Sequence, residues 1–165
     1  MNSMDADNTM TIGRKKTRLA AVILFILYFV VLFYFLFFSE EMGRTYSERT
    51  YHYNLIPFRE IRRFIHYRNV LGFEAVFLNL AGNIAAFVPF GTFLPLFYQR
   101  CRKWGYTALY SFELSLLVEL LQLIFKVGSF DVDDLLLNTI GGILGFFIYV
   151  AVRYLGRKKY GGKKA

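Results

Sequence analysis

The sequence predicts an all-α integral membrane protein, a bundle of four transmembrane helices with a short amphipathic helix in its first outer loop, at the membrane interface. Of its 165 residues, 56% are hydrophobic and 19% are aromatic, and soluble domains contain fewer aromatic residues and more charge. The charged residues are clustered, and the apolar runs between them are about 20 residues long, the length that an α-helix needs to cross a bilayer. The four predicted spans are Leu19–Phe38, Ala75–Tyr98, Gly105–Phe125 and Val132–Val152.

The distribution of basic residues predicts the orientation of these spans. The net charge of +8 would suit a nucleic-acid-binding protein, but the basic residues are concentrated beside the apolar runs. Thirteen of the 20 lie before span one, between spans two and three, or after span four. Because basic residues favour the cytoplasmic side, both termini are expected in the cytoplasm, and no nucleic-acid partner is expected. The predicted domains are a basic cytoplasmic tail 1–18, a membrane domain 19–152 and a basic cytoplasmic tail 153–165.

The first outer loop contains the predicted amphipathic helix. Pro57 suits the first turn of a helix, and Glu60 suits its positive end. The apolar face holds Phe58, Ile61, Phe64 and Ile65, and the basic face holds Arg59, Arg62, Arg63 and His66. The basic face predicts a surface for an anionic lipid headgroup or a pyrophosphate. The alternative is an ordinary interfacial helix whose arginines pair with Asp131, Asp133 or Asp134.

Spans one and two differ in their polar content. Span one has no charged or amide side chain and no signal-peptide exit, so it predicts an uncleaved anchor that packs against the other helices. Span two carries Asn79 and Asn83 four residues apart on one face. These amides either belong to a ligand site or only form hydrogen bonds between helices. Gly82 predicts a close helix contact, and Pro89 and Pro95 predict a kinked or partly unwound inner half.

Spans three and four carry polar stripes that predict the functional centre. The stripe in span three consists of Ser111, Ser115, Glu119 and Gln122. The stripe in span four consists of Asp134, Asn138, Gly141 and Gly145. The short turn between the spans makes them antiparallel neighbours, so the two stripes can meet, and polar residues inside a bilayer indicate function because they are costly there. Glu113 lies off the stripe, near the middle of the membrane.

The turn between spans three and four is acidic. Its residues Asp131, Asp133 and Asp134 could ligate a divalent cation, or Asp133 or Asp134 could cap the fourth helix. The turn lacks the pattern of a full calcium loop, and the two histidines have no ligand spacing. We therefore expect no metal and no cofactor. Gly141 and Gly145 form a GxxxG pattern, which predicts helix packing and a homo-oligomer through that face.

Four blocks of residues, in this order, resemble the VanZ-like family of small bacterial membrane proteins, which is named for a teicoplanin-resistance protein. The blocks are Asn54-Leu-Ile-Pro57-Phe58; Asn79-x-x-Gly82-Asn83 followed by Phe87-x-Pro89-x-Gly91; Glu119-x-x-Gln122; and Phe130-Asp131-x-Asp133-Asp134 with Asn138, Gly141 and Gly145. Many members carry an arginine just before the aspartate turn, where this chain has Val127-Gly128-Ser129. If that arginine neutralises the acids or binds a phosphate in the family, Lys126 or the basic face Arg59–Arg63 must substitute for it here.

The resemblance implies a bacterial plasma-membrane protein of the cell envelope that lowers susceptibility to teicoplanin and similar lipoglycopeptides. Our first hypothesis is non-enzymatic binding of a lipid-linked cell-wall precursor, or of the drug, in the outer leaflet. One alternative is an intramembrane enzyme that modifies a lipid or envelope substituent, with Glu119 and Asp134 as general acid and base. A further alternative is a small proton-coupled carrier with Glu113 and Glu119 as a relay. The candidate binding residues are Asn54, Arg59, Asn79, Asn83, Glu119, Gln122, Asp131, Asp134 and Asn138.

Overall fold

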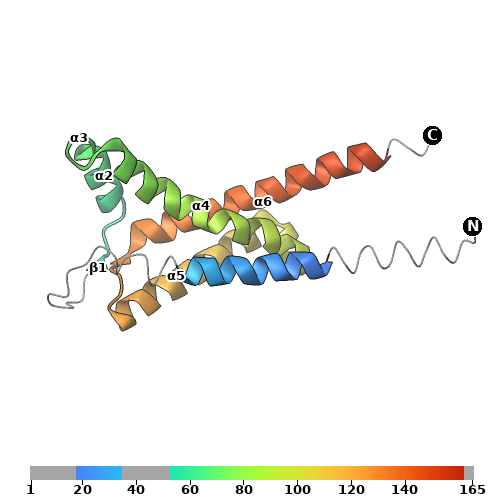
Figure 1. Ribbon diagram of the computed structural model, residues 1–165, viewed down its shortest axis with the longest axis horizontal. Helices are drawn as coiled ribbons and strands as arrows, with labels where there is room; N and C mark the ends of the chain where they lie inside the picture. The colour runs from blue at the N-terminus through green and yellow to red at the C-terminus, as the bar shows by residue number, and fades with distance from the viewer. Residues whose placement is uncertain (1–17, 35–52, 162–165) are drawn as a thin grey trace, which may run out of the picture.

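The computed structural model describes residues 18–34 and 53–161 (Figure 1). The chain begins with a first helix, Arg18–Tyr34. After it come β1 (Tyr53–Asn54), α2 (Arg59–His66), α3 (Arg68–Leu71), α4 (Phe73–Phe97), the 3-10 turn η1 (Gln99–Arg102), α5 (Trp104–Phe125), β2 (Phe130–Asp131) and α6 (Val132–Gly161).

The three longest helices correspond to three of the predicted spans. Within the described residues, α4, α5 and α6 are each long and apolar enough to cross a membrane. Their starts agree with the predicted spans to within two residues. The first helix is also apolar, and residues 35–38 of the predicted first span lie outside the described residues. The protein is therefore an all-α membrane bundle, as the apolar runs predict.

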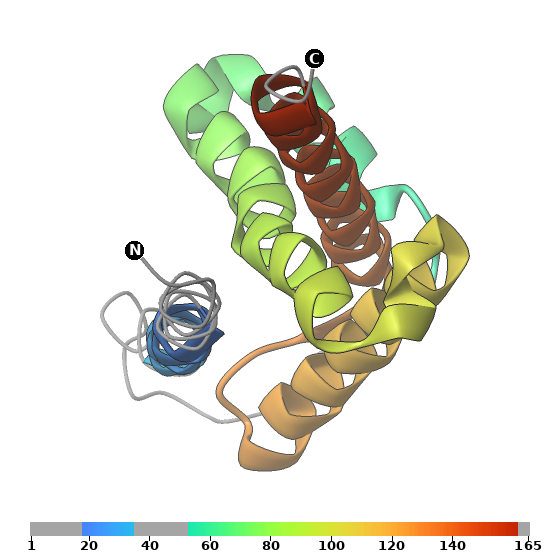
Figure 2. The same ribbon diagram turned by 90° about the vertical axis from the view of Figure 1, so that its right-hand side faces the viewer.

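The bundle is organised around the contact between α4 and α6. These helices cross in the middle of the molecule, and their contact is the most extensive one between described elements (Figure 1). α5 packs against α6, and Figure 2 shows the bundle along its long axis, with the first helix nearly end-on. The first helix joins at the side, where Phe25, Tyr28 and Phe29 pack against a cluster of Phe90, Leu94 and Cys101. The Tyr28 hydroxyl also donates a 2.8 Å hydrogen bond to the Ala86 carbonyl.

Glycines permit the close approach of these helices. A Cβ added to Gly141 would overlap the Ile84 carbonyl oxygen, and one added to Gly145 would overlap the Val88 carbonyl oxygen. Both carbonyls belong to α4, so the GxxxG face of α6 is covered by α4 within the same chain. A contact between copies of the chain would therefore have to use another surface. Gly82 differs, because a Cβ added there would meet no atom within 4 Å.

Two details of the helices differ from expectation. α4 continues through Pro89 and Pro95 without interruption, so its inner half is not unwound. Membrane helices tolerate proline where neighbouring groups and small local adjustments compensate for the missing hydrogen bond.

α6 also continues past the predicted end of span four, Val152, to Gly161. In this extension the Arg153 guanidinium donates a 2.8 Å hydrogen bond to the Tyr149 hydroxyl, one helical turn earlier.

The two kinds of glycine predict opposite effects of the same substitution. Gly145→Ala should destabilise the bundle by about 1–3 kcal/mol, because the new methyl group overlaps the α4 backbone. Gly82→Ala should stabilise it by about 0.5–1 kcal/mol, because alanine favours a helix and has free space here. Unfolding in mixed detergent micelles, followed by circular dichroism, measures both. A shift in the same direction for both variants would contradict this packing.

Candidate functional site

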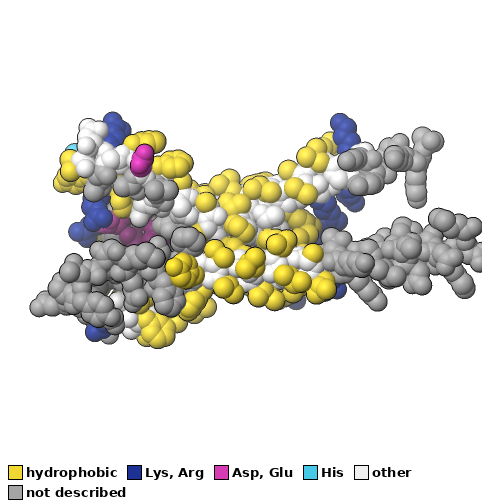
Figure 3. Space-filling view, in the orientation of Figure 1, with side chains coloured by type: hydrophobic (Ala, Val, Ile, Leu, Met, Phe, Trp, Pro, Cys, Tyr) yellow, Lys and Arg dark blue, Asp and Glu magenta, His cyan; other side chains and the backbone are white. Residues whose placement is uncertain are grey.

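Polar residues gather at the end of the bundle where α6 begins, which we call the polar end. It is formed by β1, α2, β2 and the first turn of α6 (Figure 1). β1 and β2 pair in parallel, with Tyr53 opposite Phe130 and Asn54 opposite Asp131. This pair ties the first loop to the turn between α5 and α6. Figure 3 shows an apolar middle with basic side chains at both ends of the molecule and acidic ones at the polar end of this face.

The Asp133 carboxylate holds the start of α2. One oxygen accepts a hydrogen bond from the Phe58 N–H, and the other accepts bonds from the N–H groups of Glu60 (2.8 Å) and Ile61 (3.1 Å). The first N–H groups of a helix have no partner inside the helix, and a carboxylate there also interacts favourably with the helix dipole. α2 has Phe58 at its N-cap position, with φ of 64° and no capping side chain of its own. Asp133, more than 70 residues away, supplies the missing cap.

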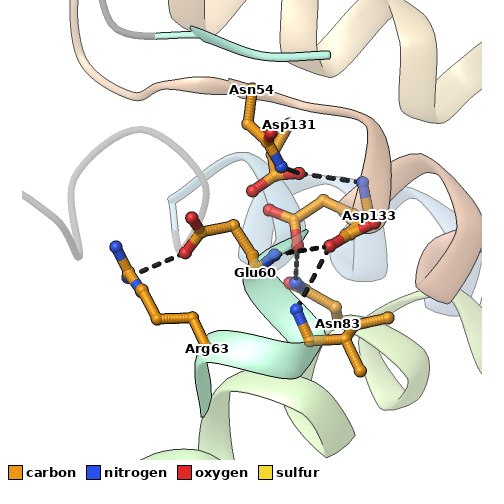
Figure 4. A network of polar contacts seen from close by, with 8 residues as sticks. Asn54, Glu60, Arg63, Asn83, Asp131 and Asp133 are labelled. Carbon is orange, nitrogen blue, oxygen red and sulfur yellow. Dashed lines mark hydrogen bonds and ion pairs between the residues drawn. The ribbon is translucent and has the colours of Figure 1, made fainter. Parts of the chain in front are cut away.

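Asp131 in turn holds the start of α6. Its Oδ1 accepts hydrogen bonds from the Asp133 N–H at 2.8 Å and from the Asn54 amide at 3.0 Å (Figure 4). The first of these is an ordinary N-cap bond to the second residue of α6. The Asp131 N–H donates a 2.8 Å bond to the Glu119 carboxylate, which is 2% exposed. Glu119 therefore links α5 to the turn, and Asn54 links β1 to it.

Two further bonds connect the helices below this turn. The Asn83 amide of α4 donates to the Asp134 carboxylate of α6. One turn deeper, the Asn138 amide nitrogen donates a 2.8 Å bond to the Ser115 hydroxyl of α5, so the two predicted stripes do meet. The Asn138 side chain is 3% exposed, and its carbonyl oxygen has no hydrogen-bond partner in the described part of the chain.

The structure brings most of the predicted site residues together but separates two of them. Asn54 and Glu119 both bond Asp131, Asn83 bonds Asp134 and Asn138 bonds Ser115, so these residues lie close to one another in three separate sets of contacts; Gln122 is also buried. Asn79 and Arg59 are exposed and take part in none of these contacts.

Sequence reasoning missed the central role of Asp133. It considered this residue as a cap for the fourth helix or as a partner for arginine, and both interpretations are wrong. Asp131 caps α6, and Asp133 bonds the backbone of α2. One signal could have found this: a predicted helix that begins with Pro57 and Phe58 has no capping side chain of its own.

The arginines of α2 line an open groove of about 510 Å³. Its walls are Arg59, Arg62, Arg63, Ile65, His66 and Tyr67. Arg63 forms a 2.8 Å ion pair with Glu60 on the same helix. Within the described residues, no ion pair or side-chain hydrogen bond involves Arg59 or Arg62. The groove thus presents guanidinium groups beside an aromatic ring and an aliphatic side chain, a surface that suits a phosphate group attached to an apolar body.

The acidic turn is not arranged as a metal site in the described part of the chain, where no group of three histidine, cysteine or acidic side chains could hold an ion. The carboxylates of Asp131 and Asp133 accept hydrogen bonds from N–H groups instead.

Sequence comparison relates the chain to known proteins. A family model described as VanZ/LLP1 matches residues 25–153. The chain belongs to the VanZ/LLP1 family. Protein VanZ of Enterococcus faecium is 33% identical to it over 86 residues, which cover 50% of this chain and 52% of that protein. The chain thus spans about half the length of this curated relative, and no solved structure matches it. The family match runs from within the first helix, through the polar end, α4 and α5, to Arg153 of α6.

The cap on α2 predicts different effects for two neighbouring aspartates. Asp133→Asn should release α2, because an amide offers one acceptor oxygen and points an NH₂ group at the N–H donors. Loss of a cap costs about 1–2 kcal/mol, so amide exchange at Glu60 and Ile61 should become about tenfold faster. Hydrogen–deuterium exchange in detergent measures this.

Asp131→Asn is the control, since an amide oxygen can still accept both Oδ1 bonds; equal exchange in the two variants would contradict the cap.

The Asp131 carboxyl predicts a dependence of stability on pH. Burial raises its pKa above the ordinary value, against the opposing hydrogen bonds from the Asp133 N–H and Asn54. The folded protein therefore binds this proton at a higher pH than the unfolded chain does. The contribution of the Asp131 carboxyl group to the free energy of unfolding should therefore grow as the pH falls through the raised pKa. It should level off once the same group is protonated in the unfolded chain too. The unfolding midpoints of wild type and Asp131→Asn should be measured between neutral and acid pH. The midpoint of wild type should rise relative to that of Asp131→Asn as the pH falls. A difference that does not change with pH would refute this.

Proposed function

We propose that this VanZ-family protein binds, at its polar end, a lipid-linked cell-wall precursor or a lipoglycopeptide drug, and that it thereby lowers susceptibility to teicoplanin. The polar end would face the outer leaflet of the bacterial plasma membrane, with both chain termini in the cytoplasm. The observation that carries the proposal is the groove of α2, where Arg59 and Arg62 lie beside Ile65 and Tyr67.

The chemistry of the groove favours an amphiphilic anion. Guanidinium groups bind phosphate oxygens in pairs of parallel hydrogen bonds, and the neighbouring ring and aliphatic chain suit the apolar part of a lipid. An exposed arginine without a carboxylate partner remains available for such a ligand. Because α2 is fixed by three hydrogen bonds to Asp133, its arginines are positioned before the ligand arrives, which reduces the entropy lost on binding.

The charge of the opposite end supports the proposed orientation. η1 and the end of α6 lie away from the polar end (Figure 1). They carry Arg100, Arg102, Arg153, Arg157 and Lys158. Positive charge next to a span favours the cytoplasmic side, so this end would be inside and the groove would be outside. A ligand that meets the protein from the cell-wall side would then reach the groove directly.

The structure offers less support for an enzyme that uses Glu119 and Asp134 as acid and base. Glu119 accepts a hydrogen bond from the Asp131 backbone, and Asp134 accepts one from Asn83. These bonds connect separate segments of the chain, so both carboxylates already have a structural role. A binding function does not require either carboxylate to give up its hydrogen bond.

The groove predicts the effect of removing Arg59 and Arg62, which form no ion pair among the described residues. Arg59→Ala/Arg62→Ala should weaken binding of a polyprenyl pyrophosphate lipid in nanodiscs about tenfold or more, because each charged hydrogen bond contributes about 1.5–3 kcal/mol. In a teicoplanin-sensitive Gram-positive host, the same variant should lose the protection that wild type confers at equal membrane levels.

The matched control removes two charges from the other end of the molecule. Arg157→Ala/Lys158→Ala should bind the lipid and protect the host as wild type does, since these residues lie far along α6 from the groove. Equal losses in both double variants would indicate an unspecific effect of charge. Lipid binding without protection by wild type would refute the resistance role, and protection that survives Arg59→Ala/Arg62→Ala would refute the groove.

A further inference from the structure

The outer face of α5 carries a row of exposed side chains with the spacing of a helix–helix seam. Its positions are Tyr106, Tyr110, Glu113, Leu117, Leu120 and Ile124, and all six are exposed in the described structure. The steps between them are four, three, four, three and four residues. This alternation is the a/d pattern of two helices that pack side by side, and it keeps one stripe facing a partner over the whole span. Figure 2 shows α5 at the outside of the bundle.

Glu113 lies at the centre of this row. α5 extends from Trp104 to Phe125, so Glu113 is more than two helical turns from either end and cannot reach water along the helix. No hydrogen bond or ion pair involves its side chain in the described part of the chain. A carboxyl group that faces lipid at this depth costs several kcal/mol without a partner. The position therefore requires a hydrogen-bonding group from outside the described bundle.

A second copy of the chain supplies such a group by symmetry. Every copy inserts with the same orientation, so the twofold axis of a dimer lies along the membrane normal. Each residue near that axis then meets its own equivalent at the same depth. Glu113 would meet Glu113, and a carboxylic acid carries both a donor and an acceptor, so two of them can bond each other. The rest of the row is apolar or aromatic and matches itself equally well.

We propose that the protein forms a parallel homodimer through the outer face of α5, with paired Glu113 side chains at the centre of the interface. The GxxxG face of α6 does not compete for this role, because α4 covers it. A single polar residue in an otherwise apolar seam fixes the register of the two helices. The dimer would place two polar ends side by side at one membrane surface.

The first experiment counts photobleaching steps of labelled protein in liposomes at decreasing protein-to-lipid ratios. Wild type should be dimeric, and Glu113→Ala should dimerise about threefold to twentyfold less tightly, the range of polar contacts between membrane helices. Glu113→Gln should stay close to wild type, because an amide keeps one donor and one acceptor. Monomeric wild type, or an unchanged dimer in Glu113→Ala, would overturn the proposal.

The second experiment leaves Glu113 intact. Oxidation in native membranes should link Leu117→Cys on the seam into a dimer of twice the mass. Leu136→Cys, exposed on α6 at about the level of Leu117 because Asn138 bonds Ser115, should stay monomeric, as should the native Cys101, which is fully buried. Equal cross-linking at Leu117 and Leu136 would overturn the proposal, and the seam would then belong to lipid or to a different membrane protein. A functional loss in Arg59→Ala/Arg62→Ala with an intact dimer keeps the two proposals separate.

Discussion

The polar end depends on the three hydrogen bonds that the Asp133 carboxylate accepts from the start of α2. Without them, a helix of eight residues with no buried side chain would have no cap and little packing to hold it. The bonds also account for the left-handed backbone at Phe58, a conformation that costs about 1 kcal/mol for a side chain of this kind. The strain is offset because it directs the Phe58 N–H at Asp133. Asp131 then fixes Asp133 in place by capping α6.

Polar residues inside the bundle have a different task. Ser111 lies so close to Gly142 that no side chain fits between them, and Ser115 bonds Asn138. Such contacts bring backbones together where lipid gives no hydrophobic driving force for helix association. The interior stripe of α5 is therefore chiefly a packing device. The binding that we propose then falls to the arginines at the surface, where phosphate and water are both within reach.

The sequence predicts the parts of this structure that depend on local pattern. Apolar length located α4, α5 and the start of α6, and helical spacing placed Glu119 and Asn138 on facing stripes. It could not predict the cap of Asp133 on α2, because that bond joins segments more than 70 residues apart. The parallel pairing of β1 and β2 was missed for the same reason: two strands of two residues have no periodicity of their own. GxxxG correctly indicated a close contact, but the pattern does not say whether the partner helix belongs to the same chain.

The membrane changes what exposure means, and the two glutamates of α5 show this. In a soluble protein an exposed Glu113 would need no explanation, and the buried Glu119 would be the anomaly. In a bilayer the order is reversed, because lipid offers a carboxyl group no hydrogen bond and the protein interior can. The Glu119 carboxylate accepts a hydrogen bond from the Asp131 N–H in the protein interior. Glu113 faces outward from the same helix, six residues away, and the described residues offer its side chain no hydrogen bond, which is the ground for the dimer proposed above.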